Sequence, residues 1–190
     1  YDFPAVKNGD VIREEFPTTS GQPMQGFVMN LRKPQFQDRR VRNALTYALN
    51  FESMNQKTFY GLYTRTDSYF EGGELASSGL PSGKELEILE AYRDKLPPEL
   101  FTTEFKLPVY DSAQAERKNL GEAVKLLSEA GWTIQDGKLV DASGKQFTIE
   151  ILGNDTTDEI ISAPFMASMK KIGIDVRLNI VDPSQYINRY

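Results

Sequence analysis

The stretch that decides the fold is residues 145–181, KQFTIEILGNDTTDEIISAPFMASMKKIGIDVRLNIV. Residues 145–152 and 174–181 are rich in β-branched residues and alternate in polarity, which is typical of strands. Residues 155–173 between them predict a helix, in which Pro164 either causes a kink or marks the true start. A strand, a helix and a second strand in this order indicate an α/β layered fold.

The same pattern extends to both sides of this stretch. Asp182 and Pro183 predict a further helix, with Asp182 as N-cap and Pro183 as its first residue. The stretch WTIQDGKLV, residues 132–140, predicts a hairpin, because Asp136-Gly137 suits a type I′ turn. Trp132 itself is expected in the core. Upstream, a capping box of Asn119 and Glu122 predicts the start of a helix that ends at Gly131. Its apolar stripe is Leu120, Ala123, Val124, Leu127 and Ala130.

The first half of the chain carries weaker patterns. Residues 26–32, GFVMNLR, predict a strand, and a short strand is possible at residues 11–16. Asp38 is expected to cap a helix, which is followed by a second short helix ending at Gly61. Ser82 and Glu85 have capping-box spacing and predict a helix to about Lys95. The buried face of the helix after Asp38 is expected to be Val41, Ala44, Leu45, Ala48 and Leu49.

Composition excludes several classes of protein. The chain has 190 residues, a formal net charge of −5, and neither cysteine nor histidine. A cysteine nucleophile, a thiolate or imidazole metal site and a Ser-His-Asp triad are therefore excluded, and no cofactor is expected. An acidic chain is a poor candidate for binding the phosphate backbone of nucleic acid. The first ten residues do not resemble a signal peptide, and both ends are expected to be cut from a longer protein.

Four motifs occur in an order that resembles one known family. They are FVMNLRKPQFQDRRVRNALTYALN, AVKLLSEAGW, FTIEIL and GIDVRLNIV. They are similar to the family 5 extracellular solute-binding proteins of ABC transporters, the oligopeptide, dipeptide and nickel type. The stretches FYGLYTRTDSYF, ELASSGLPSG and RDKLPPELFT resemble the YejA-like branch of that family more closely. The resemblance covers nearly the whole chain.

This resemblance implies a fold, a function and partners. The fold would be a periplasmic-binding-protein-like II lobe, α/β, with a mixed sheet flanked by helices and a short hairpin. Residues 1–190 would form a single domain, the middle segment and second lobe of a bilobal protein, with an irregular N-terminal stretch at 1–25. The parent would be a periplasmic, non-enzymatic component of an ABC importer. It would capture oligopeptides or peptide-like solutes between its lobes and would meet the membrane only through the permease subunits.

The arginine cluster DRRVR opens a helix, where cations oppose the helix dipole. Arg39, Arg40 and Arg42 could form an anion site, or they could pair with nearby carboxylates while Asp38 caps the helix. The family resemblance favours the second interpretation, because family members that bind different classes of ligand share this motif. Asp38, Arg40 and Arg42 are therefore expected to be a structural signature.

Two loops are candidates for the ligand site. In residues 59–70, Tyr63, Arg65 and Tyr69 suit contact with a peptide, since rings cover apolar groups and a guanidinium binds a carboxylate. The alternative is that this loop packs under the lobe, which we expect for Phe59 and Phe70.

The second candidate is GNDTTDE, residues 153–159, which follows a strand and precedes a helix. Ligands gather at the carboxyl ends of strands in open α/β folds. Asn154, Asp155 and Thr156 are therefore candidate ligand residues, and free N–H groups there could hold a carboxylate. The alternative is that Thr156 or Thr157 only caps the helix.

Two other classes of protein stay open at this point. The chain could be an α/β hydrolase segment that uses carboxylates, or a purely structural domain. Asp158 and Glu159 are adjacent on the expected helix and point in different directions, so they cannot flank one bond together.

Overall fold

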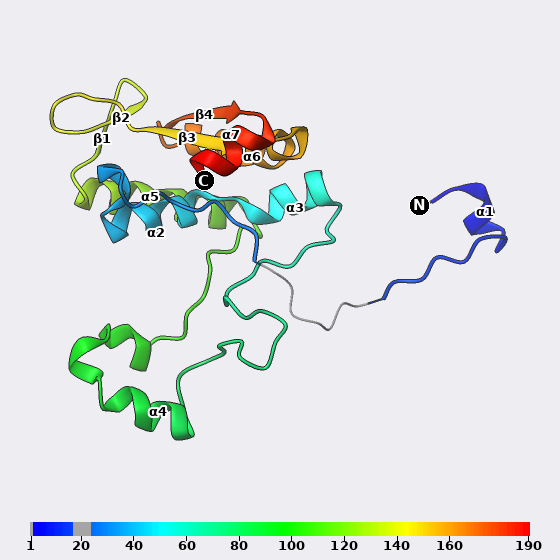
Figure 1. Cartoon of the computed structure of the whole chain (residues 1–190), viewed down its shortest axis with the longest axis horizontal. Helices are drawn as coiled ribbons and strands as arrows, with labels where there is room; N and C mark the ends of the chain where they lie inside the picture. The colour runs from blue at the N-terminus through cyan, green and yellow to red at the C-terminus, as the bar shows by residue number, and fades with distance from the viewer. Residues whose placement is uncertain (1, 17–23) are drawn as a thin grey trace. The chain divides into compact units, whose positions relative to one another are not determined.

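The computed structural model describes residues 2–16 and 24–190 (Figure 1). These residues group into two compact units. The larger unit comprises residues 26–65 and 105–190, and the smaller unit comprises residues 66–104 with the described part of 1–25. No helix in the described part of the chain is both long and apolar enough to cross a membrane.

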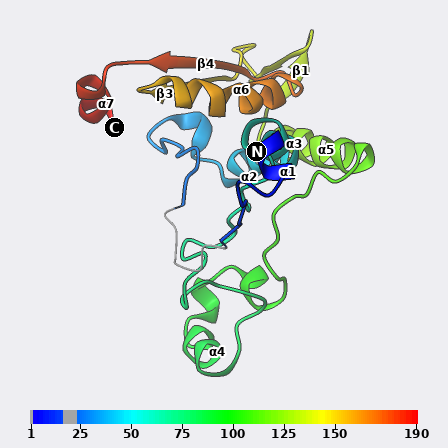
Figure 2. The ribbon, with the colours of Figure 1, turned by 90° about the vertical axis from the view of Figure 1, so that its right-hand side faces the viewer.

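The stretch that decides the fold forms a parallel strand pair joined by a helix. Strand β3 (Thr148–Gly153) lies parallel to β4 (Asp175–Ile180), with Thr148 opposite Asp175. Helix α6 (Thr156–Lys170) runs along one face of this pair (Figures 1 and 2). Pro164 lies inside α6, so the alternative in which it marks the start of the helix is wrong.

The predicted hairpin is confirmed. Strands β1 (Thr133–Gln135) and β2 (Lys138–Val140) pair antiparallel around Asp136 and Gly137, whose φ angles are 48° and 75°. Two positive φ angles are the mark of a type I′ turn. The backbone N–H of Leu139 donates to the carbonyl of Gly173 at 2.8 Å, which ties the hairpin to the start of β4. The α/β class is confirmed. Among the described residues the sheets are the β1–β2 hairpin and the parallel β3–β4 pair, where a mixed sheet with a short hairpin was expected.

Three further helices pack beneath this layer. Helix α2 (Arg39–Ala48) packs against α5 (Ala113–Glu129), and both α2 and α3 (Phe51–Phe59) contact α6. Asp38 caps α2 as expected, and its side chain accepts from the N–H of Arg40 at 2.8 Å. Helix α5 is capped by Ser112 rather than by Asn119. The predicted start was wrong. Asn119 lies inside α5, where it is buried and its side-chain amide donates to the Val109 carbonyl at 2.8 Å.

Two further helix ends lie at or next to the predicted residues. Helix α3 ends with Tyr60 in the left-handed region at φ 56°, one residue before the expected cap Gly61, whose φ is 77°. Helix α7 (Pro183–Arg189) begins as expected, since Asp182 is its N-cap and accepts from the N–H of Gln185.

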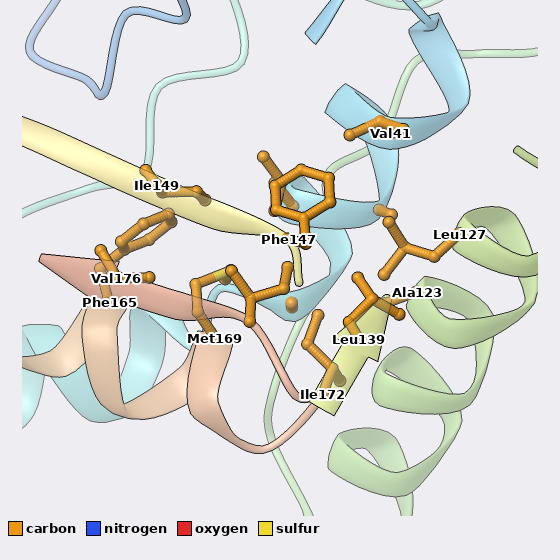
Figure 3. Packing of buried hydrophobic residues seen from close by; sticks show 14 of the residues in the cluster. Val41, Ala123, Leu127, Leu139, Phe147, Ile149, Phe165, Met169, Ile172 and Val176 are labelled. Carbon is orange, nitrogen blue, oxygen red and sulfur yellow. The ribbon is translucent and has the colours of Figure 1, made fainter. Parts of the chain in front are cut away.

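The core of the larger unit lies where α2, α5 and α6 meet the strands. Figure 3 shows Val41, Leu127 and Met169, from three helices, gathered around Phe147, which is 1% exposed. Trp132 packs edge-on against Phe147 with ring centroids 4.5 Å apart, as expected of a core residue. Burial of such side chains is the main stabilising contribution to this unit.

Two stretches predicted as strands are not strands. Residues 11–16 and 26–32 have no strand partner among the described residues. Residues 27–29 still alternate in burial, because Phe27 and Met29 pack against the core while Val28 is 85% exposed. The Phe27 ring stacks on Phe165 at 4.4 Å, so side-chain packing rather than strand pairing fixes this segment.

The smaller unit is made of short helices and turns. It contains α1 (Pro4–Lys7), α4 (Gly83–Glu90) and the 3-10 helices η2 (Arg93–Lys95) and η3 (Pro98–Phe101). Helix α4 ends five residues before the predicted Lys95, and Ser82 makes no side-chain cap bond. No described apolar residue of this unit is buried, and its one buried residue in the described part is Ser68.

Candidate functional site

The loop after β3 places three predicted ligand residues at the start of α6. Asp155 is the N-cap of α6, and its carboxylate accepts from the N–H groups of Thr157 at 2.6 Å and Asp158 at 3.2 Å. The N–H of Asn154 donates to the Asp158 carboxylate at 2.8 Å. The expectation that Thr156 or Thr157 caps the helix is therefore wrong. Asp155 and Asp158 already take up N–H groups that could have held a ligand carboxylate.

Gly153 fixes how closely this loop approaches its neighbours. A Cβ atom at this position would lie 2.7 Å from the Ile180 Cδ1 atom and 2.9 Å from the Asp158 Cβ atom. Such distances are shorter than van der Waals contact, so only glycine fits here without movement. The close approach brings the start of α6 against the end of β4.

Tyr63 follows α3 and is held by a side chain from that helix. The Asn55 amide donates to the Tyr63 carbonyl at 2.6 Å and accepts from the Tyr63 N–H at 3.1 Å. The Tyr63 ring meets the Phe59 ring edge-on at 4.6 Å between centroids. The ring is 55% exposed, so it is oriented by the chain and open to solvent. The half-buried Phe59 agrees with its expected packing role.

Arg65 is half-buried, and its side chain bonds to backbone carbonyls of the larger unit. Its Nη1 donates to the Pro108 carbonyl at 2.7 Å, and its Nη2 donates to the Thr46 carbonyl at 3.4 Å. The guanidinium also lies 5.9 Å from the centre of the Phe51 ring. Burial lowers the pKa of Arg65, although the nearby Glu52 carboxylate acts in the opposite direction. A guanidinium has five N–H donors, so these two bonds leave donors unused.

The segment that receives Arg65 is fastened at two further residues. The carbonyl of Val109 accepts from Asn119 at 2.8 Å, and the N–H of Tyr110 donates to Glu52 at 3.1 Å. The Tyr110 hydroxyl donates to the Tyr47 carbonyl. Burial, with the nearby Glu116 carboxylate, raises the pKa of Tyr110 to about 12. Residues 108–110 are thus bound to α2, α3 and α5.

Tyr69 belongs to the smaller unit. It is 81% exposed, and its neighbour Phe70 is 59% exposed. Within the smaller unit Phe70 packs into no core, because no apolar residue is buried among the described residues of that unit.

Two of the three arginines in the cluster make side-chain contacts within the described chain, and of the three only Arg40 pairs with a carboxylate. Arg40 forms a two-pronged ion pair with Asp38 and donates from Nη1 to the Glu129 carbonyl at 2.6 Å, at the end of α5. Arg42 donates to the carbonyls of Phe36 and Gln37, both at 2.8 Å. The Arg40 hydrogen bond lowers the pKa of Asp38. These bonds join the start of α2 to the end of α5 and to η1 (Pro34–Phe36).

The structure assembles the predicted ligand residues only in part. Tyr63 follows α3, Asn154, Asp155 and Thr156 open α6, and these two helices contact each other. Tyr69 lies in the other unit. Among the described residues, no group of histidine, cysteine or acidic side chains could hold a metal ion.

A family model agrees with the order of motifs along the chain. The model of the bacterial extracellular solute-binding proteins, family 5, middle part, matches residues 2–190. This chain belongs to that family. Family 5 is a class of solute-binding proteins rather than a class of enzymes, and it gives no support to the hydrolase alternative.

Family 5 relatives of the YejA type are similar over the whole chain. The probable peptide-binding protein YejA of Agrobacterium fabrum is 47% identical over all of this chain. The peptidoglycan-binding protein YepA of the same organism is 36% identical over 98% of the chain, and YejA of Escherichia coli is 37% identical over 94%. The chain spans 31%, 30% and 30% of these three relatives, about a third of their length.

Solved family 5 structures share the fold. The oligopeptide-binding protein AppA of Bacillus subtilis, solved with a nonapeptide, superposes with a TM-score of 0.58 at 25% identity. The match covers 84% of this chain and 26% of AppA. NikZ of Campylobacter jejuni superposes with a TM-score of 0.57 at 20% identity, over 81% of this chain and 25% of NikZ.

Two surface cavities in the larger unit lie away from the predicted ligand residues. One, of about 470 Å³, is lined by Lys138, the end of α6 and the start of β4. The other, of about 400 Å³, lies between residues 106–111 and α5. Neither cavity includes a predicted ligand residue.

Sequence reasoning missed the residues that position the Arg65 segment. Glu52, Tyr110 and Asn119 each bond to a residue at least ten positions away. The stretch 99–116 has no periodic pattern, so nothing in it indicated these bonds. The one available hint was Asn119, a polar residue within the apolar stripe of α5.

Proposed function

We propose that this chain is part of the second lobe of the substrate-binding component of an ABC importer, which captures oligopeptides or peptide-like solutes between two lobes. The observation that carries this proposal is the family 5 match over residues 2–190, with a probable peptide-binding protein at 47% identity. The proposed protein is periplasmic, binds no nucleic acid, and reaches the membrane only by docking on permease subunits. It releases its solute unchanged.

The proposed ligand residues are Tyr63, Arg65, Tyr69, Asn154, Asp155 and Thr156. The exposed and oriented ring of Tyr63 supports a role in covering apolar parts of a peptide. The side chains of Asn154 and Thr156 make no hydrogen bond within the described chain and stand at the carboxyl end of β3. The cavities of the larger unit do not include these residues, which fits a site that a second lobe completes.

Calorimetry on the full-length protein that carries this chain tests the proposal. Linear peptides of five to nine residues are titrated, and the masses of the bound and released peptides are measured by mass spectrometry. We expect saturable binding and peptides of unchanged mass. Peptide fragments in the released fraction would establish an enzyme, and the absence of binding to every peptide would overturn the solute class.

One relative favours a second solute class. The peptidoglycan-binding protein YepA is 36% identical to this chain. Cell-wall fragments carry short peptides that include D-amino acids, so they share amide and carboxylate groups with linear peptides. Competition between a muropeptide and a linear peptide of equal length distinguishes the two. Displacement of the linear peptide by a much lower concentration of muropeptide would favour the second class.

A further inference from the structure

A cavity of about 470 Å³ lies between the β1–β2 hairpin, the last turn of α6 and the start of β4. Helix α6 has 15 residues and spans about 22 Å, and the predicted ligand residues Asn154, Asp155 and Thr156 stand at its other end. The cavity is therefore separate from that part of the proposed peptide site. Its volume is within the range of cavities that hold small molecules, about 300–1,000 Å³.

Backbone hydrogen bonds hold the walls of this cavity in place. The N–H of Leu139 donates to the Gly173 carbonyl at 2.8 Å, and the N–H of Asp175 donates to the Phe147 carbonyl at 3.2 Å. Gly173 has a φ of 81°, and a Cβ atom there would lie 2.7 Å from the Leu139 nitrogen. Only glycine permits this approach of the hairpin to the turn after α6. A site with fixed walls loses little conformational entropy when it binds a ligand.

The lining of the cavity is partly apolar and partly polar. Ile174 and Val176, which are 2% and 8% exposed, and the half-buried Met166 supply the apolar part. Gln146 is also half-buried, and its amide makes no hydrogen bond to another described residue. The two N–H donors of this amide can therefore bond to a ligand oxygen. This lining favours a ligand that has both an apolar part and an oxygen acceptor.

Two cations line the same cavity. Lys138 in β2 and Lys170 in the last turn of α6 are both exposed, and neither ammonium group forms an ion pair or a hydrogen bond with another described residue. The helix dipole favours a cation at the end of a helix, which accounts for Lys170 but not for Lys138. Asp175, the one acid in the lining, is paired with Arg177 at 3.0 Å. The unpaired charge at the cavity is therefore positive.

We propose that this cavity binds an amphipathic monoanion, a carboxylate with a short apolar tail. The ammonium groups of Lys138 and Lys170 and the amide of Gln146 donate to the carboxylate, and charge-assisted bonds are stronger than neutral ones. The tail packs on the apolar part of the lining, and its burial stabilises the complex in proportion to its area. A phosphate dianion fits less well, because the Asp175 carboxylate, which only accepts, lines the same cavity. This second ligand site is independent of the proposed peptide capture.

Calorimetry on the full-length protein compares acetate, hexanoate, octanoate and octanol. We expect octanoate to bind about tenfold more tightly than hexanoate, because two more methylene groups leave water. Octanol, which has the tail without the charge, should bind about tenfold more weakly than octanoate. High salt should weaken octanoate binding, because exposed lysines are screened, and should leave octanol unaffected. Acetate should show no saturable binding.

Paired variants assign the binding to this cavity. Lys138→Gln/Lys170→Gln should weaken octanoate binding by about tenfold and leave octanol binding unchanged. The matched control Lys57→Gln/Lys145→Gln removes the same charge at exposed positions outside the lining, one of them in the last turn of α3. The control should bind octanoate as the wild type does. Thermal unfolding checks that both variants are folded.

Met166 reports directly on the occupied cavity. In protein labelled with carbon-13 in the methionine methyl groups, octanoate should shift the one resonance that is missing from the spectrum of Met166→Leu. A shift confined to other methionines would overturn the proposed location. Absence of octanoate binding, or equal affinity for octanoate and octanol, would overturn the anion site. An equal loss of affinity in the control and in Lys138→Gln/Lys170→Gln would also overturn it, because net charge alone would then explain the result.

Discussion

Arg65 donates a hydrogen bond from Nη1 to the backbone carbonyl of Pro108 at 2.7 Å, between residues 43 positions apart. Arg65 is the last residue of the larger unit before residues 66–104, and Pro108 follows shortly after the chain returns to it. The bond therefore joins the outgoing and returning segments within the larger unit. Asn119, Glu52 and Tyr47 fasten the two residues after Pro108 to the same unit.

Arg65→Met tests this junction. The variant keeps an apolar stem but removes the donors, so the carbonyls of Pro108 and Thr46 lose a partner. We expect the free energy of unfolding to fall by about 1 kcal/mol, because two part-buried acceptors lose a hydrogen-bond partner. Amide hydrogen exchange at residues 105–110 should rise at the same time. Arg39→Met is the control, because Arg39 is exposed and makes no side-chain bond within the described chain. An equal effect in both variants would contradict a specific role for the junction.

Tyr110→Phe tests the hydroxyl beneath the junction. The pKa of Tyr110 is raised to about 12 by burial, above the ordinary value of 10.0. The folded state therefore holds this proton more tightly than the unfolded state, so the stabilising contribution is lost as the pH rises from about 10 to about 12. Urea unfolding of the wild type should show a steeper loss over this range than Tyr110→Phe. Tyr60→Phe, at an 84% exposed position, should behave like the wild type.

Asp38→Asn separates the charge of the α2 cap from its hydrogen bond. Asparagine retains an acceptor oxygen for the Arg40 N–H but cannot form the ion pair. The pKa of Asp38 is lowered in the folded state by Arg40, so its contribution is present above about pH 4 and lost as the pH falls through the lowered value.

Urea midpoints at pH 6 and pH 3 measure the effect. The wild type should lose more stability between these values than Asp38→Asn. Asp136→Asn is the control, since Asp136 sits in the hairpin turn and asparagine tolerates its φ of 48°. If the acid sensitivity of Asp38→Asn equals that of the wild type, the ion pair does not stabilise α2.

Gly153→Ala tests the close approach of β4 to the start of α6. The new Cβ would overlap Ile180 and Asp158, so we expect a loss of about 1–3 kcal/mol in the free energy of unfolding. Adding Ile180→Ala should recover part of this loss by removing one of the two overlaps. Gly121→Ala in α5, where the new methyl meets nothing within 4 Å, should instead stabilise the protein by about 0.5–1 kcal/mol. Thermal unfolding measures all three changes.

The sequence could predict the parts of the fold that depend on neighbouring residues. The turn at Asp136-Gly137 and the caps at Asp38 and Asp182 involve bonds over two or three positions, and all three were predicted correctly. The stripe of α5 was also found, because helical periodicity is a local property. The start of α5 was not predicted correctly. Serine and asparagine are both acceptable N-caps, and the side chain of Asn119 bonds to the Val109 carbonyl instead of capping the helix.

Predictions failed where a distant partner decides the outcome. Residues 26–32 have the alternation of a strand but no pairing partner among the described residues. Arg65 and Tyr63 were selected by residue type, yet the bonds of Arg65 to Thr46 and Pro108 depend on how α2 and the returning segment pack. No spacing rule in the sequence contains that information.

The Arg65–Pro108 bond also bears on how such proteins diversify. This bond lies within the larger unit, and the hydrophobic core of that unit contains no described residue from 66–104. Insertions, deletions and exchanges there can accumulate during evolution without repacking the scaffold. The same junction offers engineers a natural splice point for grafting recognition loops taken from other transport receptors.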